Sequence, residues 1–464
     1  MAGGGVKFGT SGLRGPAAAL EGQVARRYVA AFLRHAGLAG GSRVFLGRDF
    51  RVSSPAIMRD CAAAIGAAGL EPVDCGTLPT PALALHAMAA GGAAIMVTGS
   101  HIPGDRNGLK FYLASGEISK ANEAGIVAAL RDEVVPDFAG EMADEAAAAE
   151  ARYVARFASL LPEGVLAGWR IGVFEHSSVA RDLLGLILRG FGAEVVSLGR
   201  SADFVPVDTE AFGDAVFAPL PGWVADYGLD AIVSADGDGD RPLLMDGRGG
   251  FVRGDVLGLI TARYLGAQSV VTPVTSNSGI ERTGAFSRVV RTRVGSPYVI
   301  EAMAGAPGAA IGFEANGGTF VGENVKAAGV ALPPLVTRDA VLPLLCALGL
   351  AAAKGRSVAE VVVELPLQHA LAGRLQDVPG EKSAAFLARL AGDTDYARRL
   401  FVPHGIAGLS DIDGLQFRTE AGDMVHFRAS GNAPELRCYV EAGTEAGARE
   451  LLDWGLAVAA REVG

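Results

Sequence analysis

The 464-residue sequence predicts several α/β domains with largely parallel sheets, followed by a smaller C-terminal α+β domain. Short apolar runs alternate with alanine-rich helical segments, which is the pattern of β-α-β units. The length corresponds to about three or four domains of ordinary size. The alternation stops near the C-terminus, where two β-like stretches within 413–442 are followed by a helical segment at 444–463.

The runs that establish the alternation are short and apolar, as expected for buried strands. They lie at 42–49, 71–76, 93–98, 169–176, 193–199, 266–277 and 308–318. The segment 54–70 begins with Ser-Pro and has a glycine near its end, which are helix start and stop signals. The segment 177–192 is also expected to be helical. Composition changes near 140–150, 250 and 365–370 mark candidate domain boundaries, although no strict internal repeat is visible.

The bulk composition restricts the partners and the compartment. The net charge of −10 disfavours general binding to nucleic acid or to anionic membranes. Four scattered cysteines without zinc-ligand spacing indicate reduced thiols. The N-terminal segment lacks the apolar core of a signal peptide, and the longest apolar stretch, 340–353, is too short to span a bilayer. We therefore expect a cytoplasmic protein in which 340–353 forms a buried helix.

Two glycine-containing loops in the N-terminal part have the residue types of a phosphate site. In "FGTSGLRG", 8–15, glycines let backbone amides approach an anion, and Arg14 supplies a planar fork for phosphate. In "TGSHIPGDRNGLKFY", 98–112, Ser100 follows the end of a strand, where open α/β sheets bind ligands, and Lys110 follows as a cation. The alternatives are a polar turn for the first loop and a helix N-cap for Ser100.

The stretch "SADGDGDR", 234–241, predicts a divalent-cation site. Asp236, Asp238 and Asp240 repel one another unless a cation holds them, and oxygen ligands suit Mg²⁺ or Ca²⁺. An EF-hand is excluded because Arg241 and Gly247 occupy its obligatory glycine and glutamate positions. Arg241 beside the three carboxylates indicates an anion that shares the metal. A solvated acidic turn is the alternative.

Two further loops have the groups needed to bind a phosphorylated sugar. In "GFEANGG", 312–318, Glu314 and Asn316 provide the acceptors and donors that sugar hydroxyls require. In "FRASGNAPELR", 427–437, a phosphate cradle is expected from a cluster of cationic, hydroxyl, amide and glycine residues. Its members are Arg428, Ser430, Gly431, Asn432 and Arg437. A plain polar loop or hairpin turn is the alternative in both cases.

The five motifs occur in one order along the whole chain, as FGTSGLRG, TGSHIP, DGDGDR, GFEANGG and RASGNAP. No Walker A, HExxH or convincing dinucleotide-binding pattern is present. On these motifs the sequence resembles the α-D-phosphohexomutase superfamily, and within it the phosphomannomutase/phosphoglucomutase group. The resemblance implies three related α/β domains with mixed, largely parallel sheets and a distinct α+β domain around one central cleft. The corresponding domain ranges are 1–148, 149–250, 251–366 and 367–464.

The resemblance also implies a role for each motif. Ser100 would carry a phosphoryl group, and the three aspartates would bind Mg²⁺ together with an oxygen of phosphorylated Ser100. His101 would orient the reacting group or help to deprotonate it. Lys110, Arg14 and Arg241 would stabilise the charge on the phosphoryl group during its transfer. The loop 312–318, with Glu314 and Asn316, would bind the sugar hydroxyls, and the loop 427–437 would bind the distal phosphate of the sugar. A further loop, "RVGSPY", would add Arg293, Gly295 and Ser296 to the substrate site.

The implied activity is interconversion of a hexose 6-phosphate and a hexose 1-phosphate through a bisphosphorylated intermediate, with hexose 1,6-bisphosphate as activator. Mannose and glucose phosphates are the expected substrates, and a monomer or weak dimer is the expected assembly. The alternatives are a phosphoglucosamine mutase, a metal-dependent sugar-phosphate phosphatase, and a non-enzymatic sugar-phosphate sensor. The chain departs from the common motifs at Gly99 and Ile102, where TASHNP is usual, and at Asn316, where serine is usual.

Overall fold

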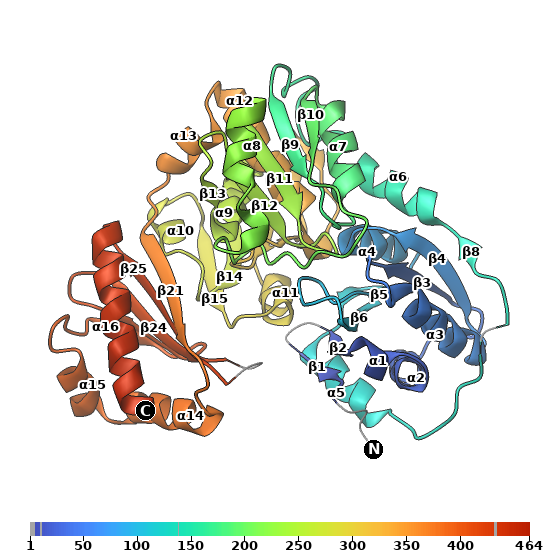
Figure 1. Ribbon diagram of the computed structural model, residues 1–464, viewed down its shortest axis with the longest axis horizontal. Coiled ribbons are helices and arrows are strands. Elements are labelled where there is room, and N and C mark those ends of the chain that lie inside the picture. Colours follow the sequence, from blue (N-terminus) through green and yellow to red (C-terminus); the bar gives the residue numbers. More distant parts are fainter. Residues whose placement is uncertain (1–4, 10–11, 138, 431–433) are drawn as a thin grey trace.

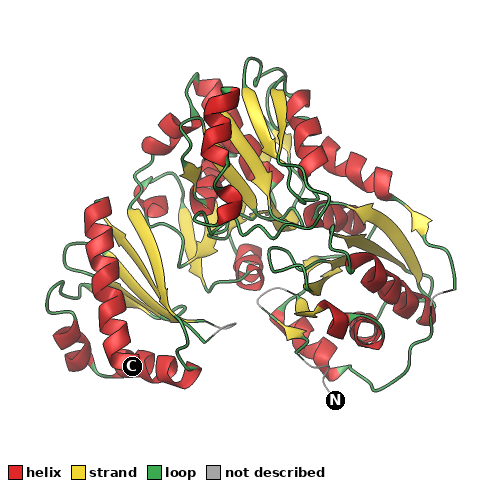
Figure 2. Cartoon of the chain, viewed as in Figure 1, coloured by secondary structure: helices red, strands yellow, loops and turns green. Residues whose placement is uncertain are grey.

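The computed structural model describes residues 5–9, 12–137, 139–430 and 434–464, whose strands form four main sheets (Figure 1). A further pair, β18 (Lys326–Ala327) and β19 (Val330–Ala331), forms a small two-stranded sheet. Figure 2 shows helices packed against each main sheet, as expected for α/β and α+β architecture.

The first sheet has the strand order β1-β2-β6-β5-β3-β4-β8, and β7 pairs with β6. Its strands are β1 (Lys7–Phe8), β2 (Leu13–Pro16), β3 (Arg43–Arg48), β4 (Glu71–Thr77), β5 (Ala93–Val97), β6 (Arg106–Leu113), β7 (Gly116–Glu117) and β8 (Ala143–Asp144). Its helices are α1 (Ala17–Leu20), α2 (Gln23–Ala36), α3 (Ser54–Ala67), α4 (Thr80–Ala89) and α5 (Lys120–Ala128). The expected strands at 42–49, 71–76 and 93–98 correspond to β3, β4 and β5.

The second sheet, ordered β10-β9-β11-β12-β13, follows α6 along the chain. Its strands are β9 (Arg170–Phe174), β10 (Glu194–Leu198), β11 (Ala231–Ala235), β12 (Pro242–Asp246) and β13 (Phe251–Val252). The helices are α6 (Ala146–Arg156), α7 (Arg181–Gly190), η1 (Ala215–Phe217) and α8 (Leu220–Tyr227). The helix expected over 177–192 begins only at Arg181. The prediction was wrong at its start because the Ser177 and Ser178 hydroxyls donate to backbone carbonyls of Val205 and Asp236, which holds this stretch as a loop.

The third sheet has the order β15-β14-β16-β17-β20. Its strands are β14 (Ser269–Pro273), β15 (Arg288–Thr292), β16 (Ala310–Phe313), β17 (Thr319–Val321) and β20 (Leu335–Asp339). The helices are α9 (Gly254–Tyr264), α10 (Gly279–Arg282), α11 (Ser296–Ala304), α12 (Val341–Lys354) and α13 (Val358–Val363). The apolar stretch 340–353 lies almost entirely in α12, which is buried along most of its length.

These three sheets share one arrangement of four consecutive strands. In each, the first strand lies between the second and the third and runs parallel to both, and the fourth strand runs antiparallel to the third. The loop between the third and fourth strands therefore occupies the same position in all three sheets. These loops are the serine loop (98–105), the aspartate loop (236–241) and the glutamate loop (314–318).

The fourth sheet is entirely antiparallel, in the order β21-β25-β24-β23-β22. Its strands are β21 (His369–Leu375), β22 (Gly408–Ser410), β23 (Leu415–Arg418), β24 (Met424–Ala429) and β25 (Leu436–Ala442), and its helices are α14 (Gly380–Gly392), α15 (Thr394–Leu400) and α16 (Glu445–Val463). The α+β expectation is confirmed, but 413–442 contains three strands rather than two β-like stretches, because the chain turns back between Arg418 and Met424.

One hydrophobic core connects the first three sheets, whereas the fourth has its own. The shared core includes Phe45 of β3, Val173 of β9 and Phe313 of β16. The separate core contains Phe417, Phe427 and other residues after 377. The first sheet is buried on both faces, as expected for parallel strands between helices, since Phe45 faces the shared core while Val44 faces a second core.

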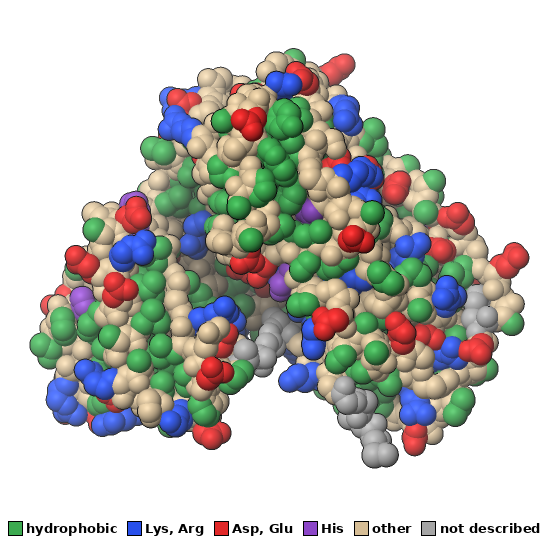
Figure 3. Space-filling view, in the orientation of Figure 1, with side chains coloured by type: hydrophobic (Ala, Val, Ile, Leu, Met, Phe, Trp, Pro, Cys, Tyr) green, Lys and Arg blue, Asp and Glu red, His purple; other side chains and the backbone are tan. Residues whose placement is uncertain are grey.

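The four sheets surround a hollow that opens between the lobe of β1–β8 and the lobe of β21–β25 (Figure 3). A cleft of about 490 Å³ lies beside the fourth sheet and is lined by residues of the third and fourth sheets and by the segments 208–212, 253–254 and 314–316. Polar loops from different sheets thus meet at one cleft, which is where the site must be sought.

Candidate active site

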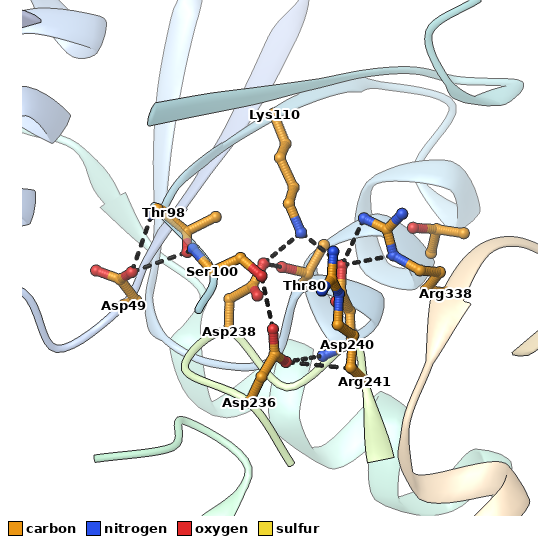
Figure 4. A network of polar contacts seen from close by, with 12 residues as sticks. Asp49, Thr80, Thr98, Ser100, Lys110, Asp236, Asp238, Asp240, Arg241 and Arg338 are labelled. Carbon is orange, nitrogen blue, oxygen red and sulfur yellow. Dashed lines mark hydrogen bonds and ion pairs between the residues drawn. The ribbon is translucent and has the colours of Figure 1, made fainter. Parts of the chain in front are cut away.

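Ser100 lies at the start of the serine loop in a backbone conformation that L-residues seldom adopt, with φ of 56°. Its side chain is directed toward the aspartate loop, and Oγ donates to Asp236 Oδ2 at 2.6 Å (Figure 4). The same Oγ lies 3.1 Å from His101 Nδ1, and the Ser100 amide donates to Thr98 Oγ1 at 2.8 Å. These contacts do not match a helix N-cap; they bring Ser100 to the expected metal site.

The three aspartates of the aspartate loop are completely buried, and one oxygen of each lies within 4.8 Å of those of the others. Lys110 Nζ donates to Asp238 Oδ2 and to Asp240 Oδ2, both at 2.5 Å. Thr80, at the start of α4, donates its hydroxyl to Asp238 Oδ2 at 2.7 Å. The sequence did not single out Thr80, which lies outside the five motifs.

The remaining carboxylate oxygens fit a hard divalent cation. Asp238 Oδ1 and Asp240 Oδ1 are buried and have no hydrogen-bond partner among the described residues. Burial and repulsion from Asp238 and Asp240 raise the pKa of Asp236 well above its ordinary value. A divalent cation would satisfy the two oxygens and relieve the repulsion. The described part of the chain offers this cluster of three carboxylates, without histidine or cysteine, as a metal site.

Cations surround the carboxylates and Ser100. Burial alone would lower the pKa of Lys110, but Asp238 and Asp240 raise it above its ordinary value. Burial, together with the neighbouring Arg241, lowers the pKa of Arg14 to about 10. Burial and the same arginines lower the pKa of His101 far below its ordinary value, so the imidazole is neutral. The structure therefore brings together the expected Ser100, His101, Lys110, Arg14 and Arg241.

Arg338, near the end of β20, connects the aspartate loop to the glutamate loop. Its side chain is 3% exposed, and Nε and Nη2 donate to Asp240 Oδ2 at 3.0 and 2.9 Å. Its Nη1 donates to Glu314 Oε2 at 2.9 Å. Burial alone would raise the pKa of Asp240, but Arg338 and Lys110 outweigh burial and hold that pKa well below its ordinary value. Sequence reasoning missed Arg338, since it belongs to no motif.

The glutamate loop lines the cleft together with residues of the fourth sheet. Glu314 and Asn316 both line it, and they are 5% and 7% exposed. Arg437 of β25 lies on the other side, as expected. Arg253 and Arg374 also line the cleft, although the sequence did not point to them. The cleft thus brings the Glu314 carboxylate and the Asn316 amide together with several guanidinium groups.

Asp413 connects the "RVGSPY" loop to the last loop. Its Oδ2 accepts the Val294 amide at 2.9 Å and Arg428 Nε at 2.8 Å. Arg293 is exposed, and its guanidinium lies 5.4 Å from the centre of the Tyr298 ring. The Asp413 carboxylate therefore binds both Arg428 of β24 and the backbone next to Arg293.

The remaining substrate residues expected from the sequence are Gly295, Ser296, Ser430, Gly431 and Asn432. Gly295 has a φ of 132°, and Ser296 begins α11 with its hydroxyl donating to Glu117 Oε1 at 2.6 Å. Ser296 is therefore buried against the first sheet. Ser430 donates its amide to the Glu435 carbonyl, and the expected Gly431 and Asn432 lie outside the described residues.

Comparison with known proteins identifies the family. The chain is 49% identical over 469 aligned residues to a phosphomannomutase of Sinorhizobium fredii, covering 98% of each protein. The chain belongs to the phosphoglucomutase/phosphomannomutase family. Family models for its alpha/beta/alpha domains I and III match residues 5–134 and 253–368. A phosphomannomutase of Salmonella muenchen is 40% identical, covering 97% of this chain and 94% of its own length.

The fold of this phosphoglucomutase/phosphomannomutase family member also matches a solved structure. A family protein from Burkholderia thailandensis superposes with a TM-score of 0.77 at 20% identity, covering 98% of this chain and 97% of its own. This similarity concerns the fold alone. Within the described residues, no helix combines the length and the apolar character needed to cross a bilayer.

Proposed function

We propose that this protein interconverts the 6-phosphate and the 1-phosphate of a hexose, with Ser100 as the phosphoryl carrier. The observation that carries the proposal is the hydrogen bond from Ser100 Oγ to Asp236, within a cluster of buried carboxylates and cations. Phosphoryl transfer needs positioning and charge neutralisation more than covalent chemistry by the protein, and this site supplies both. The phosphomannomutase names of two full-length relatives support the same reaction.

In the first half-reaction, a sugar hydroxyl oxygen attacks phosphorus, the new P–O bond forms, and the bond from phosphorus to Ser100 Oγ breaks. The electron pair of the broken bond returns to Oγ, which receives a proton, while the attacking hydroxyl loses one. His101 lies 3.1 Å from this oxygen and is placed to orient it or pass that proton. Lys110, Arg14 and Arg241 lie around the transferring group, where they stabilise its charge.

Mg²⁺ is the metal we propose for Asp236, Asp238 and Asp240, with an oxygen of phosphorylated Ser100 as a further ligand. It favours a few carboxylates together with phosphate oxygens, and when bound it would neutralise charge on the transferring phosphoryl group. The aspartates are held ready by Lys110, Thr80 and the backbone amides of Asp240 and Arg241.

The second half-reaction is the reverse transfer from the other end of the sugar. The bisphosphorylated intermediate must turn over so that its second phosphate faces Ser100, and hexose 1,6-bisphosphate would thereby serve as an activator. We propose that the intermediate turns in the cleft between the glutamate loop and strands β21 and β25. We propose that the last loop holds the distal phosphate in each orientation, through Arg428, Ser430, Gly431, Asn432 and Arg437. The "RVGSPY" loop would approach the substrate with Arg293, Gly295 and Ser296.

We propose mannose and glucose phosphates as the sugars. They differ in the orientation of the 2-hydroxyl, and Glu314 and Asn316 are proposed to bind the 3- and 4-hydroxyls. Strong discrimination needs a buried polar group that one substrate leaves unpaired. The comparison to make is kcat/KM for mannose 1-phosphate, glucose 1-phosphate and glucosamine 1-phosphate. We expect the first two to differ by less than about 1,000-fold, or about 4 kcal/mol, with the third poorer.

The proposal extends to domain limits and assembly. We propose domains at 1–148, 149–250, 251–366 and 367–464, and each main sheet falls within one range except that β13 extends the second sheet to Val252. We further propose a cytoplasmic monomer or weak dimer that binds phosphosugars rather than nucleic acid or membranes.

The deciding experiment measures both isomer formation and phosphate release from mannose 1-phosphate with Mg²⁺ and a catalytic amount of hexose 1,6-bisphosphate. A mutase forms mannose 6-phosphate with little free phosphate, and a peptide map of the resting enzyme places a phosphoryl group on Ser100. Phosphate release without isomer would establish the phosphatase alternative. Tight binding without any turnover would establish the sensor, and faster turnover of glucosamine 1-phosphate would establish the aminosugar mutase.

A further inference from the structure

The serine loop lies on a fully buried ion pair from the loop that follows β3. The side chains of Asp49 and Arg51 are 0% exposed, and Arg51 Nε donates to Asp49 Oδ2 at 3.0 Å. Neither residue belongs to a motif to which we assigned a role. A buried ion pair is costly unless its other donors and acceptors find partners, and here most of those partners belong to the serine loop.

Arg51 binds the backbone of the serine loop along its length. Its Nη2 donates to the carbonyls of Ser100 and Ile102 at 3.0 and 2.6 Å. Its Nη1 donates to the carbonyls of Pro103 and Arg106 at 2.6 and 3.0 Å. The rigid guanidinium fork therefore fixes the path of the chain from Ser100 to the start of β6.

Asp49 binds the other side of the same loop. Its Oδ2 accepts the Thr98 hydroxyl at 2.8 Å and the Gly99 amide at 3.3 Å. The Thr98 hydroxyl accepts the Ser100 amide in turn, so a chain of hydrogen bonds runs from Asp49 to the backbone of Ser100 (Figure 4). None of these contacts uses Ser100 Oγ, which leaves that atom available to receive and release a phosphoryl group.

The packing around Arg51 shows how little freedom the arrangement leaves. A Cβ at position 99 would lie 2.7 Å from Arg51 Cζ, so the guanidinium in this position leaves no room for a side chain at Gly99. The ring of Phe204, in the segment between β10 and η1, stacks on the Arg51 guanidinium, and the ring centre lies 3.9 Å from Cζ. Arg51 thus cannot move aside without losing contacts on every side.

We propose that Asp49, Arg51 and Thr98 form a clamp that positions Ser100 for phosphoryl transfer. The clamp holds Ser100 in its left-handed backbone conformation, and this conformation directs Oγ toward Asp236. The three residues are positioning residues, since none of them touches the transferring group. The inference rests on the proposed function. Its consequence is that weakening the clamp lowers kcat more than it raises KM, because the sugar-binding loops remain in place.

The test compares Thr98→Val with Thr98→Ser, together with Arg51→Lys. Thr98→Val keeps the shape and removes the hydroxyl, and we expect kcat for mannose 1-phosphate to fall about 100-fold, as a misplacement of about 1 Å can cause, with KM within about threefold. Thr98→Ser keeps the hydroxyl and should restore most of the activity. Arg51→Lys keeps the charge without the fork, and it should lower kcat in the same manner.

The second readout is the amount of phosphate released per isomer formed. A loosened loop exposes the phosphoryl group to water, so this ratio should rise for Thr98→Val and Arg51→Lys. Arg48→Gln is the matched control, because the Arg48 guanidinium donates to the Thr77 hydroxyl at 2.6 Å instead of to the serine loop. It should leave kcat and the ratio unchanged.

Two results would overturn the clamp. One is wild-type kcat and wild-type phosphate release in Thr98→Val and Arg51→Lys. The other is equal loss in Thr98→Val and Thr98→Ser that follows only a lower melting temperature. Ser100→Ala distinguishes failure of the proposed function from failure of the clamp. An active Ser100→Ala enzyme refutes the proposed function. An inactive Ser100→Ala enzyme together with unaffected clamp variants refutes the clamp alone.

Discussion

The serine loop and the aspartate loop occupy equivalent positions in two sheets of the same topology, yet different groups hold them. Arg51 and Asp49, an ion pair, support the backbone of the serine loop. The aspartate loop is supported by neutral groups: Ser178 Oγ donates to the Asp236 carbonyl at 2.9 Å, and the Thr80 amide donates to the Asp238 carbonyl at 2.9 Å. The cations near the aspartate loop contact its side chains instead.

The difference agrees with what the proposed function requires each loop to bind. A serine that carries a phosphoryl group gains negative charge, and a guanidinium beneath its backbone is compatible with that charge. The aspartates are already anionic, and their neighbouring cations leave Asp238 Oδ1 and Asp240 Oδ1 without hydrogen-bond partners. Two loops with the same position in the strand topology are thus suited to different proposed functions by the residues that contact them.

Removing the reactive atom of the serine loop should have the largest effect. In Ser100→Ala we expect kcat to fall by about 10⁴-fold, or about 5.5 kcal/mol of transition-state stabilisation, since a methyl group cannot carry a phosphoryl group. A coupled assay for mannose 6-phosphate measures the loss, and calorimetric binding of mannose 1-phosphate shows that the cleft is intact. Activity within tenfold of the wild type would contradict the assignment.

Removing a carboxylate from the aspartate loop should come next. In Asp238→Asn we expect a loss of about 100-fold or more in apparent affinity for Mg²⁺, because the site loses an anionic ligand and Lys110 loses a partner. The measurement is activity as a function of Mg²⁺ after treatment with EDTA. For the wild-type enzyme, EDTA should abolish activity and Mg²⁺ should restore it. Full activity in EDTA would show that the loop binds no essential metal.

Arg338 connects the aspartate loop to the glutamate loop, and its removal should destabilise the fold itself. Arg338→Met leaves Glu314 buried without the cation it contacts and leaves Asp240 with Lys110 but without Arg338, and breaking a buried pair in this way typically costs about 3–5 kcal/mol. Urea unfolding measures the change. The control is Arg356→Met, whose partner Glu364 is 34% exposed, and there we expect a loss below about 1 kcal/mol. Equal losses in the two variants would show that burial does not decide the effect.

A methyl group inserted between the serine loop and its support should have a smaller effect. Gly99→Ala would place a Cβ 2.7 Å from Arg51 Cζ, and we expect kcat to fall about tenfold, or about 1.4 kcal/mol. Gly222→Ala is the control, because no atom lies within 4 Å of a Cβ built there. If Gly99→Ala turned over at the wild-type rate, the contact with Arg51 would not constrain Ser100.

The smallest effect is expected under the aspartate loop. Ser178→Ala removes one neutral hydrogen bond to the Asp236 carbonyl, which contributes about 1 kcal/mol to the free energy of unfolding. We expect kcat to change by less than about threefold, since the amides of Asp240 and Arg241 still hold the Asp236 carboxylate. A loss of kcat as large as that of Thr98→Val would remove the contrast between the two loops.

Much of the candidate site could be predicted because its residues form motifs at strand ends. Ser100, Asp236 and Glu314 each follow an apolar strand, and loops at the same end of neighbouring sheets come close together. The α/β alternation likewise predicted seven strands of the first three sheets, namely β3, β4, β5, β9, β10, β14 and β16. The shared strand order could not be predicted, because strand pairing does not require sequence similarity and no repeat is visible.

The supporting arginines could not be found from a motif. Arg51 lies shortly after the end of β3, whereas Arg338 lies within β20 and reaches a partner 98 positions away in the chain. Burial of such a residue requires a buried anion, but the sequence does not say which one.

The division of the hydrophobic core has a consequence for how the protein melts. The first three sheets share one core, so their unfolding should be cooperative, whereas the residues after 377 enclose a core of their own. A calorimetric scan of such a molecule should show two transitions rather than one, and the shared core should give the one with the larger enthalpy. The residues after 377 would then unfold and refold while Ser100 and the three aspartates keep their places in the rest of the molecule.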